Sequence, residues 1–268
     1  ELDQAMQKIE KENPFYEEDL YKRYLSANPI ETLTDEEQNW LEQHGAVRIG
    51  YLKKDVGVSL ANAESGEPTG ILNDYISLAS NCMGEKSIEF QTIGFDSQEE
   101  ELQALKDNRI DMIFHMNQNP YEAEQNDIIL SNTVFEVNVA VLTGVAKFDE
   151  NGENTVAVSR NNLLGKWYIS FNYPSWKIKE YDSSAEVEKA VHSGEADCFV
   201  VKAGQSLKTL ANSKMHSVFL TKSGDSCFAV TRENTTLMNI LNKTIQTLPD
   251  SRLSSLFSVY ENTPGKVT

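Results

Sequence analysis

The side chains that most often perform acid–base or metal chemistry are few and scattered in this chain. Four histidines are present, and none lies at the spacing at which histidines and cysteines share a zinc ion. The chain also lacks the G-x-S-x-G, P-loop and G-x-G-x-x-G motifs. We therefore predict that the protein has no metal, no cofactor and no catalytic residues, and that it is not an enzyme. The histidines are His44, His115, His192 and His216.

Two further features could still carry acid–base chemistry. His115 follows an apolar run and is the histidine best placed for proton transfer. Glu99, Glu100 and Glu101 are three consecutive carboxylates. Because neighbouring residues of a helix point in different directions, we expect these glutamates to form the solvated first turn of a helix.

Composition narrows the classes of partner. The chain has 268 residues, enough for one large domain or two ordinary ones, and a formal net charge of −17. A strongly acidic protein is a poor ligand for nucleic acid phosphates. We expect the three cysteines, Cys82, Cys198 and Cys227, to be buried thiols; the alternative is a disulfide between two of them.

The ends of the chain suggest a larger protein. No apolar run is long enough to span a membrane, and the chain begins at Glu1 without a signal-peptide pattern. We expect any anchor to lie outside this sequence. Leu2, Pro14 and Leu20 have counterparts at Leu237, Pro249 and Leu256, so residues 1–28 resemble the closing helices of a preceding, similar module. Two unrelated amphipathic hairpins are the alternative.

A helix end followed by a buried strand occurs twice. Residues 104–111 lead into the apolar run 112–114, and residues 190–197 lead into 198–201. Asn108 and Gly194 mark the turns, because both residue types tolerate the left-handed backbone that ends a helix. The short apolar runs are typical of strands that are buried on both faces.

The same alternation continues along the chain. We expect a strand at 46–51 after a helix that begins near Thr34 with a capping-box signal, an edge strand at 88–93, and a strand at 167–171. Helices are predicted at 71–82 and 97–106. Residues 133–142 form a long apolar connection, so the pattern indicates two α/β lobes.

Several segments in this order resemble bacterial extracellular solute-binding proteins of family 3, which are periplasmic and amino-acid-binding-like. They are most similar to the tandem sensor modules of membrane histidine kinases and diguanylate cyclases. Ser131–Phe135 looks like an altered form of the family's Ser-Asp-Pro-Tyr segment. The segments are Leu33–Glu37 with Trp40 and Leu41, Val47–Tyr51, Gly66–Tyr75, Leu102–Ile113, Ser131–Phe135, Leu164–Lys166 and Gly194–Val201.

The resemblance implies an α/β, two-lobed periplasmic-binding-protein fold (Venus flytrap, type II) with two hinge crossovers. Lobe 1 would comprise 33–138 plus 229–262, and lobe 2 would comprise 139–228. Residues 1–32 would be the N-terminal helical segment, and 263–268 a C-terminal tail. A ligand bound in the cleft would stabilise the closed form through its higher affinity for that form.

The family's charged anchors for an amino acid are missing. Family members hold the ligand carboxylate with an arginine after the third strand of lobe 1, but residues 115–125 contain no arginine. Lys202 stands where the family places an acid for the ligand ammonium. Pro174, in the turn that would hold an anion, has no N–H to donate. Binding of an ordinary amino acid by the usual mode is therefore not expected.

We expect a small molecule in the cleft, either anionic at Lys202 or containing a ring that stacks on aromatic side chains. The alternatives are a solvated lysine and aromatic residues that simply pack the lobe. The predicted partners are this ligand, a neighbouring module and a membrane-linked output domain. The chain itself is expected outside the cytoplasm, at the cell surface or in the periplasm, and anchored to the membrane in the full-length protein. A transporter's solute-binding protein, a non-binding structural module and, through a few family relatives, a dehydratase are alternatives. The candidate ligand-binding residues are Tyr51, Asp55, Asn117, Gln118, Tyr173, Ser175, Trp176 and Lys202.

Overall fold

The first described helix begins where the sequence predicts. The computed structural model describes residues 32–55, 58–62, 66–83, 87–203 and 214–248, so the segments expected at 1–28 and 249–268 lie outside it. Helix α3 (Asp35–His44) starts at Thr34, whose hydroxyl accepts from the Glu37 backbone N–H while the Glu37 carboxylate accepts from the Thr34 N–H. This reciprocal capping satisfies two N–H groups that a helix start leaves unpaired.

Two five-stranded sheets share one pattern of strand directions. In the first sheet, β1 (Val47–Leu52) pairs in parallel with β5 (Phe90–Phe95) and β6 (Met112–Asn117). Strand β13 (Gly224–Thr231) then lies antiparallel between β6 and β7 (Ile128–Val137). The order is β5-β1-β6-β13-β7, and β5 is an edge strand, as predicted for that segment.

The second sheet repeats this plan. Strand β9 (Thr155–Ser159) pairs in parallel with β10 (Lys177–Tyr181) and β11 (Cys198–Lys202). Strand β8 (Val139–Thr143) lies antiparallel between β11 and β12 (His216–Phe219). The order is β10-β9-β11-β8-β12, so β6 and β11 hold equivalent middle positions in the two sheets. We call the first sheet with its helices lobe 1 and the second lobe 2.

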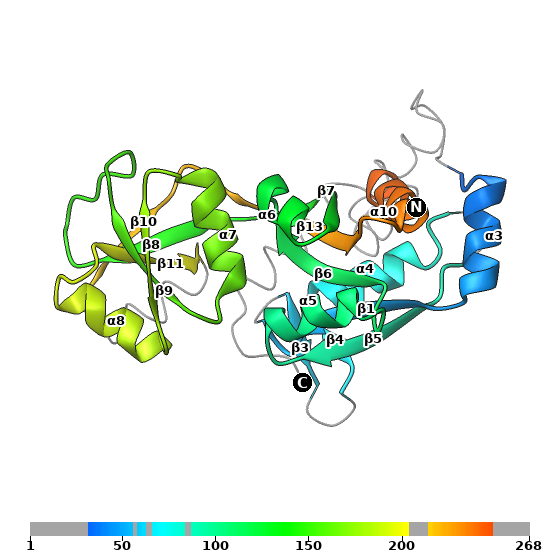
Figure 1. The fold of residues 1–268 in the computed structure, drawn as a ribbon, viewed down its shortest axis with the longest axis horizontal. Coiled ribbons are helices and arrows are strands. Elements are labelled where there is room, and N and C mark those ends of the chain that lie inside the picture. The colour runs from blue at the N-terminus through cyan, green and yellow to red at the C-terminus, as the bar shows by residue number, and fades with distance from the viewer. Residues whose placement is uncertain (1–31, 56–57, 63–65, 84–86, 204–213, 249–268) are drawn as a thin grey trace, which may run out of the picture. The chain divides into compact units, whose positions relative to one another are not determined.

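The predicted repeat, a helix end followed by a buried strand, supplies one of these two middle strands in each sheet. Helix α5 (Gln98–Lys106) precedes β6, and α8 (Ser184–His192) precedes β11. Asn108 and Gly194 adopt φ angles of 55° and 75°, the left-handed backbone that the sequence signals at both turns. Figure 1 shows α8 against β9, β10 and β11, which it contacts.

Short connections join the lobes. Asn138 alone separates β7 from β8, and residues 220–223 separate β12 from β13. Strand β13 spans residue 229, where lobe 1 was expected to resume. These are two crossovers within the described residues, as the fold requires.

The core of lobe 1 is rich in aromatic side chains. Helix α4 (Ile71–Ala79) buries Tyr75, whose ring centroid lies 4.7 Å from that of Phe228 and 6.2 Å from that of Phe114. Helix α10 (Thr235–Thr247) covers the same sheet, and Thr244 hydrogen-bonds the Tyr75 hydroxyl at 2.8 Å. The three cysteines are free thiols, and burial raises the pKa of Cys227 to about 12.

The strand predicted at 167–171 is wrong, because these residues belong to helix α7 (Leu163–Asn172). One broad face of α7 is buried between the lobes: Leu164 and Trp167 join a core cluster of lobe 1, whereas Tyr168 and Ile169 join a cluster of lobe 2. Residues 167–171 are almost continuously apolar, and periodicity alone does not distinguish such a short run from a buried strand. Asn162 caps the helix by accepting from the Gly165 N–H at 2.9 Å.

The expectation of a solvated glutamate cluster is wrong for one of its three members. Glu99 and Glu100 are exposed, but the Glu101 side chain is fully buried and its carboxylate has no hydrogen-bond partner among the described residues. It packs against Gly50 of β1, where an added Cβ would lie 3.2 Å from Glu101 Cγ. Burial, with a smaller contribution from the negative charge of Asp55, raises the pKa of Glu101 well above its usual range.

We predict that Glu101→Gln stabilises the protein increasingly as the pH rises. A carboxyl with a raised pKa stabilises the fold below its unfolded pKa and loses that contribution as the pH approaches its folded pKa. Glutamine keeps the shape but has no proton to lose. The difference in free energy of unfolding between variant and wild type should grow from pH 5 upward, by at most about 1.4 kcal/mol per pH unit.

Urea denaturation at several pH values would measure this difference. Glu99→Gln, two residues earlier in the same helix and exposed, is the matched control and should leave the pH dependence unchanged. A constant difference between Glu101→Gln and wild type across this pH range would contradict the assignment of a protonated Glu101.

Candidate functional site

Residues from both lobes enclose one cavity of about 450 Å³. This volume lies in the range that holds small-molecule ligands. Lobe 1 contributes Leu52, Lys54, Asp55, Asp96, Ser97, Gln98, His115, Asn117, Val137 and Gly224. Lobe 2 contributes Val139, Ser159, Asn161, Asn162, Leu164, Gly165, Tyr168, Ser184, Val200, Val201 and Lys202.

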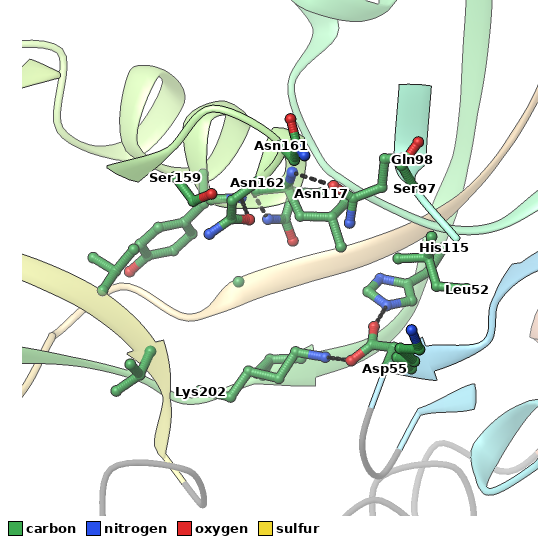
Figure 2. A pocket seen from close by; sticks show the side chains of 18 of the residues that line it. Leu52, Asp55, Ser97, Gln98, His115, Asn117, Ser159, Asn161, Asn162 and Lys202 are labelled. Carbon is green, nitrogen blue, oxygen red and sulfur yellow. Dashed lines mark hydrogen bonds and ion pairs between the residues drawn. The ribbon is translucent and has the colours of Figure 1, made fainter. Parts of the chain in front are cut away.

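A buried carboxylate lies at one side of the cavity. Asp55 ends β2 (Lys54–Asp55), which pairs with β3 (Ser59–Ala61) and through it with β4 (Pro68–Thr69) in a small sheet attached to lobe 1. Figure 2 shows that His115 and Lys202 approach the Asp55 carboxylate from different directions. The Asp55 Oδ2 lies 2.9 Å from His115 Nε2, and its Oδ1 forms an ion pair with the Lys202 ammonium. Because Lys202 ends β11 in lobe 2, this ion pair joins the lobes.

The charges of this group follow from its surroundings. Burial alone would raise the pKa of Asp55, but the Lys202 charge and the His115 hydrogen bond outweigh it and leave the pKa far below its usual value. Burial lowers the pKa of His115 despite its hydrogen bond to Asp55. The group is therefore an ionised aspartate, a neutral histidine whose Nε2–H donates, and a charged lysine.

Amide side chains form a second group, apart from the Asp55 group in Figure 2. Gln98, at the start of α5, accepts from the backbone N–H groups of Leu163 and Leu164 at 3.0 and 3.3 Å. Asn117, at the end of β6, donates to the Leu164 carbonyl at 2.6 Å. These bonds also cross between the lobes, and they meet the first turn of α7.

A third crossing lies beside the cavity. Asn119 is buried just before helix α6 (Pro120–Gln125) and donates to the Trp167 carbonyl at 3.1 Å and to the Ser170 hydroxyl at 3.0 Å. Together with Leu164 and Trp167 in the lobe 1 core, these bonds hold α7 directly against lobe 1. The protein's own groups thus connect the two lobes around the cavity.

Three of the eight predicted ligand-binding residues line the cavity: Asp55, Asn117 and Lys202. Lys202 is 22% exposed and faces Asp55 rather than solvent. The other five lie elsewhere.

Those five residues have structural contacts or face solvent. The Tyr51 side chain is buried, and its hydroxyl donates to the Gly66 carbonyl at 2.7 Å. Gln118 is half-buried, and its backbone N–H donates to the Asp225 carbonyl. Tyr173 and Trp176 stack with ring centroids 4.4 Å apart, and both bond Glu150 within lobe 2. Ser175 is exposed beside them.

The sequence interpretation missed several lining residues. Gln98 and Asn162 meet at the start of α7, which was read as a strand, so no helix start was expected there. A helix reading of 163–172 would have placed Asn162 at the N-cap position that asparagine favours. His115 was considered only for proton transfer, whereas it positions Asp55.

Two absences apply to the described part of the chain. It contains no cluster of histidine, cysteine or acidic side chains that could hold a metal ion. Across the same residues, no helix is both long enough and apolar enough to cross a bilayer.

Known proteins resemble the chain over most of its length. The virulence sensor protein BvgS of Bordetella pertussis is 24% identical over 239 residues, which cover 85% of this chain but 19% of that protein. The chain thus spans about a fifth of its curated relative. The crystal structure of the BvgS periplasmic VFT2 domain is 23% identical, covers 85% of this chain and 99% of that one, and superposes with a TM-score of 0.66.

A more distant solved structure has the same fold. The ancestral amino acid-binding protein AncCDT-1, a precursor of cyclohexadienyl dehydratase, is 16% identical, covers 83% of this chain and 96% of that one, and has a TM-score of 0.56. These neighbours confirm the two-lobed Venus flytrap fold. Residues 47–261 match the sequence model of one protein family. The chain therefore belongs to the bacterial extracellular solute-binding proteins, family 3.

Proposed function

We propose that this chain is an extracytoplasmic ligand-sensing module of a membrane-anchored bacterial receptor, which binds a small molecule between its lobes. The observation that carries this proposal is the cavity of about 450 Å³, to which both lobes contribute walls. A ligand there touches both lobes at once, so it binds the closed form more tightly than the open form and shifts the population toward closure.

The relatives support the receptor part of the proposal. BvgS is described as a virulence sensor protein, and its solved VFT2 domain is described as periplasmic. A module of this kind would pass closure to a neighbouring module and then, across the membrane, to a histidine kinase or a diguanylate cyclase. The coding sequence on both sides of this chain tests the receptor part of the proposal. A downstream membrane span followed by either output domain supports it. A gene that encodes neither the span nor an output domain, and that lies beside permease genes, contradicts it.

We predict that uncharged sugars, nucleosides or amides include compounds that raise the melting temperature, and that the standard amino acids do not. The cavity walls offer amide and hydroxyl groups but no arginine for an α-carboxylate. A ligand that binds only the native state at about 100 times its Kd adds about 2.7 kcal/mol of stability. Differential scanning fluorimetry against panels of these classes measures the effect.

A substitution in the cavity tests whether the shift in melting temperature comes from binding at this site. Asn161 lines the cavity and is exposed, so Asn161→Ala should fold normally and reduce the shift that an active compound causes. Asn151→Ala, an exposed asparagine of the same lobe outside the cavity, is the matched control. A shift that Asn161→Ala leaves intact, or a large shift with a standard amino acid, would count against the proposed site.

A second candidate function is a module that stays closed without any ligand and relays movement from its neighbour. The bonds from Gln98, Asn117 and Asn119 to α7, together with the Lys202–Asp55 ion pair, favour it because they join the lobes directly. If no compound in the panels binds, this candidate replaces the sensor.

The second candidate predicts that the ligand-free protein is closed and that Gln98→Ala combined with Asn119→Ala opens it. Each substitution leaves groups of α7 without the partners that hold it against lobe 1, at a cost of about 1–3 kcal/mol per buried group. Small-angle X-ray scattering should then give a larger radius of gyration for the double variant than for the wild type.

Gln103→Ala provides the control, because Gln103 lies on the same helix but bonds Asp107 within lobe 1. Wild-type scattering that already fits separated lobes would disprove ligand-independent closure.

A further inference from the structure

The cation that lobe 2 presents to the cavity already has an anionic partner. The Lys202 ammonium, at the end of β11, forms its ion pair with Asp55 from the opposite lobe (Figure 2). The Asp55 side chain is only 9% exposed, so it is itself part of the wall rather than a flexible surface group. A carboxylate of the protein thus lies where a ligand's anionic group would meet Lys202.

Asp55 is also held from behind. The His115 ring is 3% exposed and donates from Nε2 to Asp55 Oδ2 at 2.9 Å. An anion that displaced Asp55 from Lys202 would leave a buried carboxylate with a neutral histidine as its remaining partner. Breaking a buried ion pair in this way is strongly unfavourable, because the charge that stays behind has neither water nor a counterion.

The other group that could bind an anion is occupied as well. Backbone N–H groups at a helix start attract anions, and α7 begins at the cavity wall. Gln98 accepts from the N–H groups of Leu163 and Leu164, and Asn162 accepts from that of Gly165. The remaining lysine of the described lining, Lys54, is exposed at the edge, as is Asp96.

The rest of the wall suits an uncharged molecule with polar and apolar faces. Asn161 and Ser159 offer hydrogen bonds, and Val139, Val200 and Tyr168 offer apolar surface. Such mixed walls bury a ligand's carbon skeleton while a few polar groups fix its orientation.

We propose that Asp55 is a specificity-determining residue, which occupies Lys202 in place of a ligand anion and so restricts the cavity to uncharged polar molecules. This inference rests on the proposed ligand-binding function of the cavity. It assigns Asp55 a role as a tethered competitor of anionic ligands, and it assigns His115 the role of keeping that competitor in position.

The test measures binding of two simple anions, acetate and sulfate, by isothermal titration calorimetry at constant ionic strength. The wild type should show no saturable binding of either anion. Asp55→Asn keeps the shape, removes the competing charge and frees Lys202, so it should gain saturable binding. The gain should be about ten- to hundredfold in affinity over any wild-type signal, the usual worth of a charged hydrogen bond. Adding Lys202→Met to Asp55→Asn should abolish it.

Matched variants separate this effect from a general change in charge. Asp96→Asn removes one negative charge from the same cavity edge, but Asp96 pairs with Lys53 and not with Lys202, so this variant should gain nothing. Asp55→Glu retains a carboxylate and should continue to exclude both anions. Circular dichroism and a cooperative melting curve show which variants are folded.

Two outcomes would overturn the inference. One is a folded Asp55→Asn protein that binds neither anion better than the wild type does. The other is saturable anion binding by the wild type that Lys202→Gln removes, a measurement that does not depend on whether Asp55→Asn folds. Neither result requires the natural ligand, so failure here differs from failure of the proposed function, in which no uncharged compound binds.

Discussion

The buried charge of Asp55 needs a counterion, and that counterion is on the other lobe. This requirement governs the contact between the lobes at the centre of the molecule. Asp55 belongs to lobe 1 and its cationic partner Lys202 to lobe 2, so the ion pair is complete only when the lobes are together. His115 shares the carboxylate from within lobe 1, through a bond that does not involve lobe 2. Since removing one partner of a buried pair costs far more than the pair gains by forming, the closed arrangement is favoured wherever water cannot reach Asp55.

Helix α7 is the second element that joins the lobes, and it acts through packing rather than charge. Its Tyr168 and Ile169 belong to the lobe 2 core, while its Leu164 and Trp167 complete a cluster of lobe 1. Gln98, Asn117 and Asn119 then bind its backbone from lobe 1. Opening the cleft must therefore expose apolar surface and leave backbone groups to water at the same time. In the proposed function, a ligand in the cavity would add its contacts to an interface that already exists.

The sequence predicted the parts of the fold that local chemistry determines. Thr34 and Glu37 indicated a helix start, and Asn108 and Gly194 indicated left-handed turns before the middle strands; all of these are confirmed. The strand predicted at 167–171 was wrong because a short, almost continuous apolar run looks the same in a buried strand and in a buried helix. The prediction that Glu101 is solvated was wrong because its burial depends on tertiary structure. Its neighbours in the sequence are solvated, whereas Glu101 packs against Gly50 of a strand that is distant in the sequence.

The candidate site was less predictable than the fold. Asp55, Asn117 and Lys202, which were chosen from positions in the family pattern, line the cavity, and their role in ligand binding stays a prediction. Their pairing was not found, since residues 55 and 202 are joined only through tertiary structure. Tyr173 and Trp176 were candidates for stacking on a ligand, but they bond Glu150 and pack each other inside lobe 2. Aromatic side chains are equally suited to stacking on a ligand and to packing inside a lobe. Which of the two occurs depends on the surface that the ring contacts in the folded protein.

The one-residue link at Asn138 restricts how the two lobes can move relative to each other. Strands β7 and β8 are stiff on either side of it, and residues 220–223 form the parallel return path, so the lobes can swing about a fixed axis but can hardly slide or drift apart. Helix α10 packs on β7, the strand that leads into this link. In the proposed sensor, a swing of lobe 2 about Asn138 would therefore bear on the strand that carries α10.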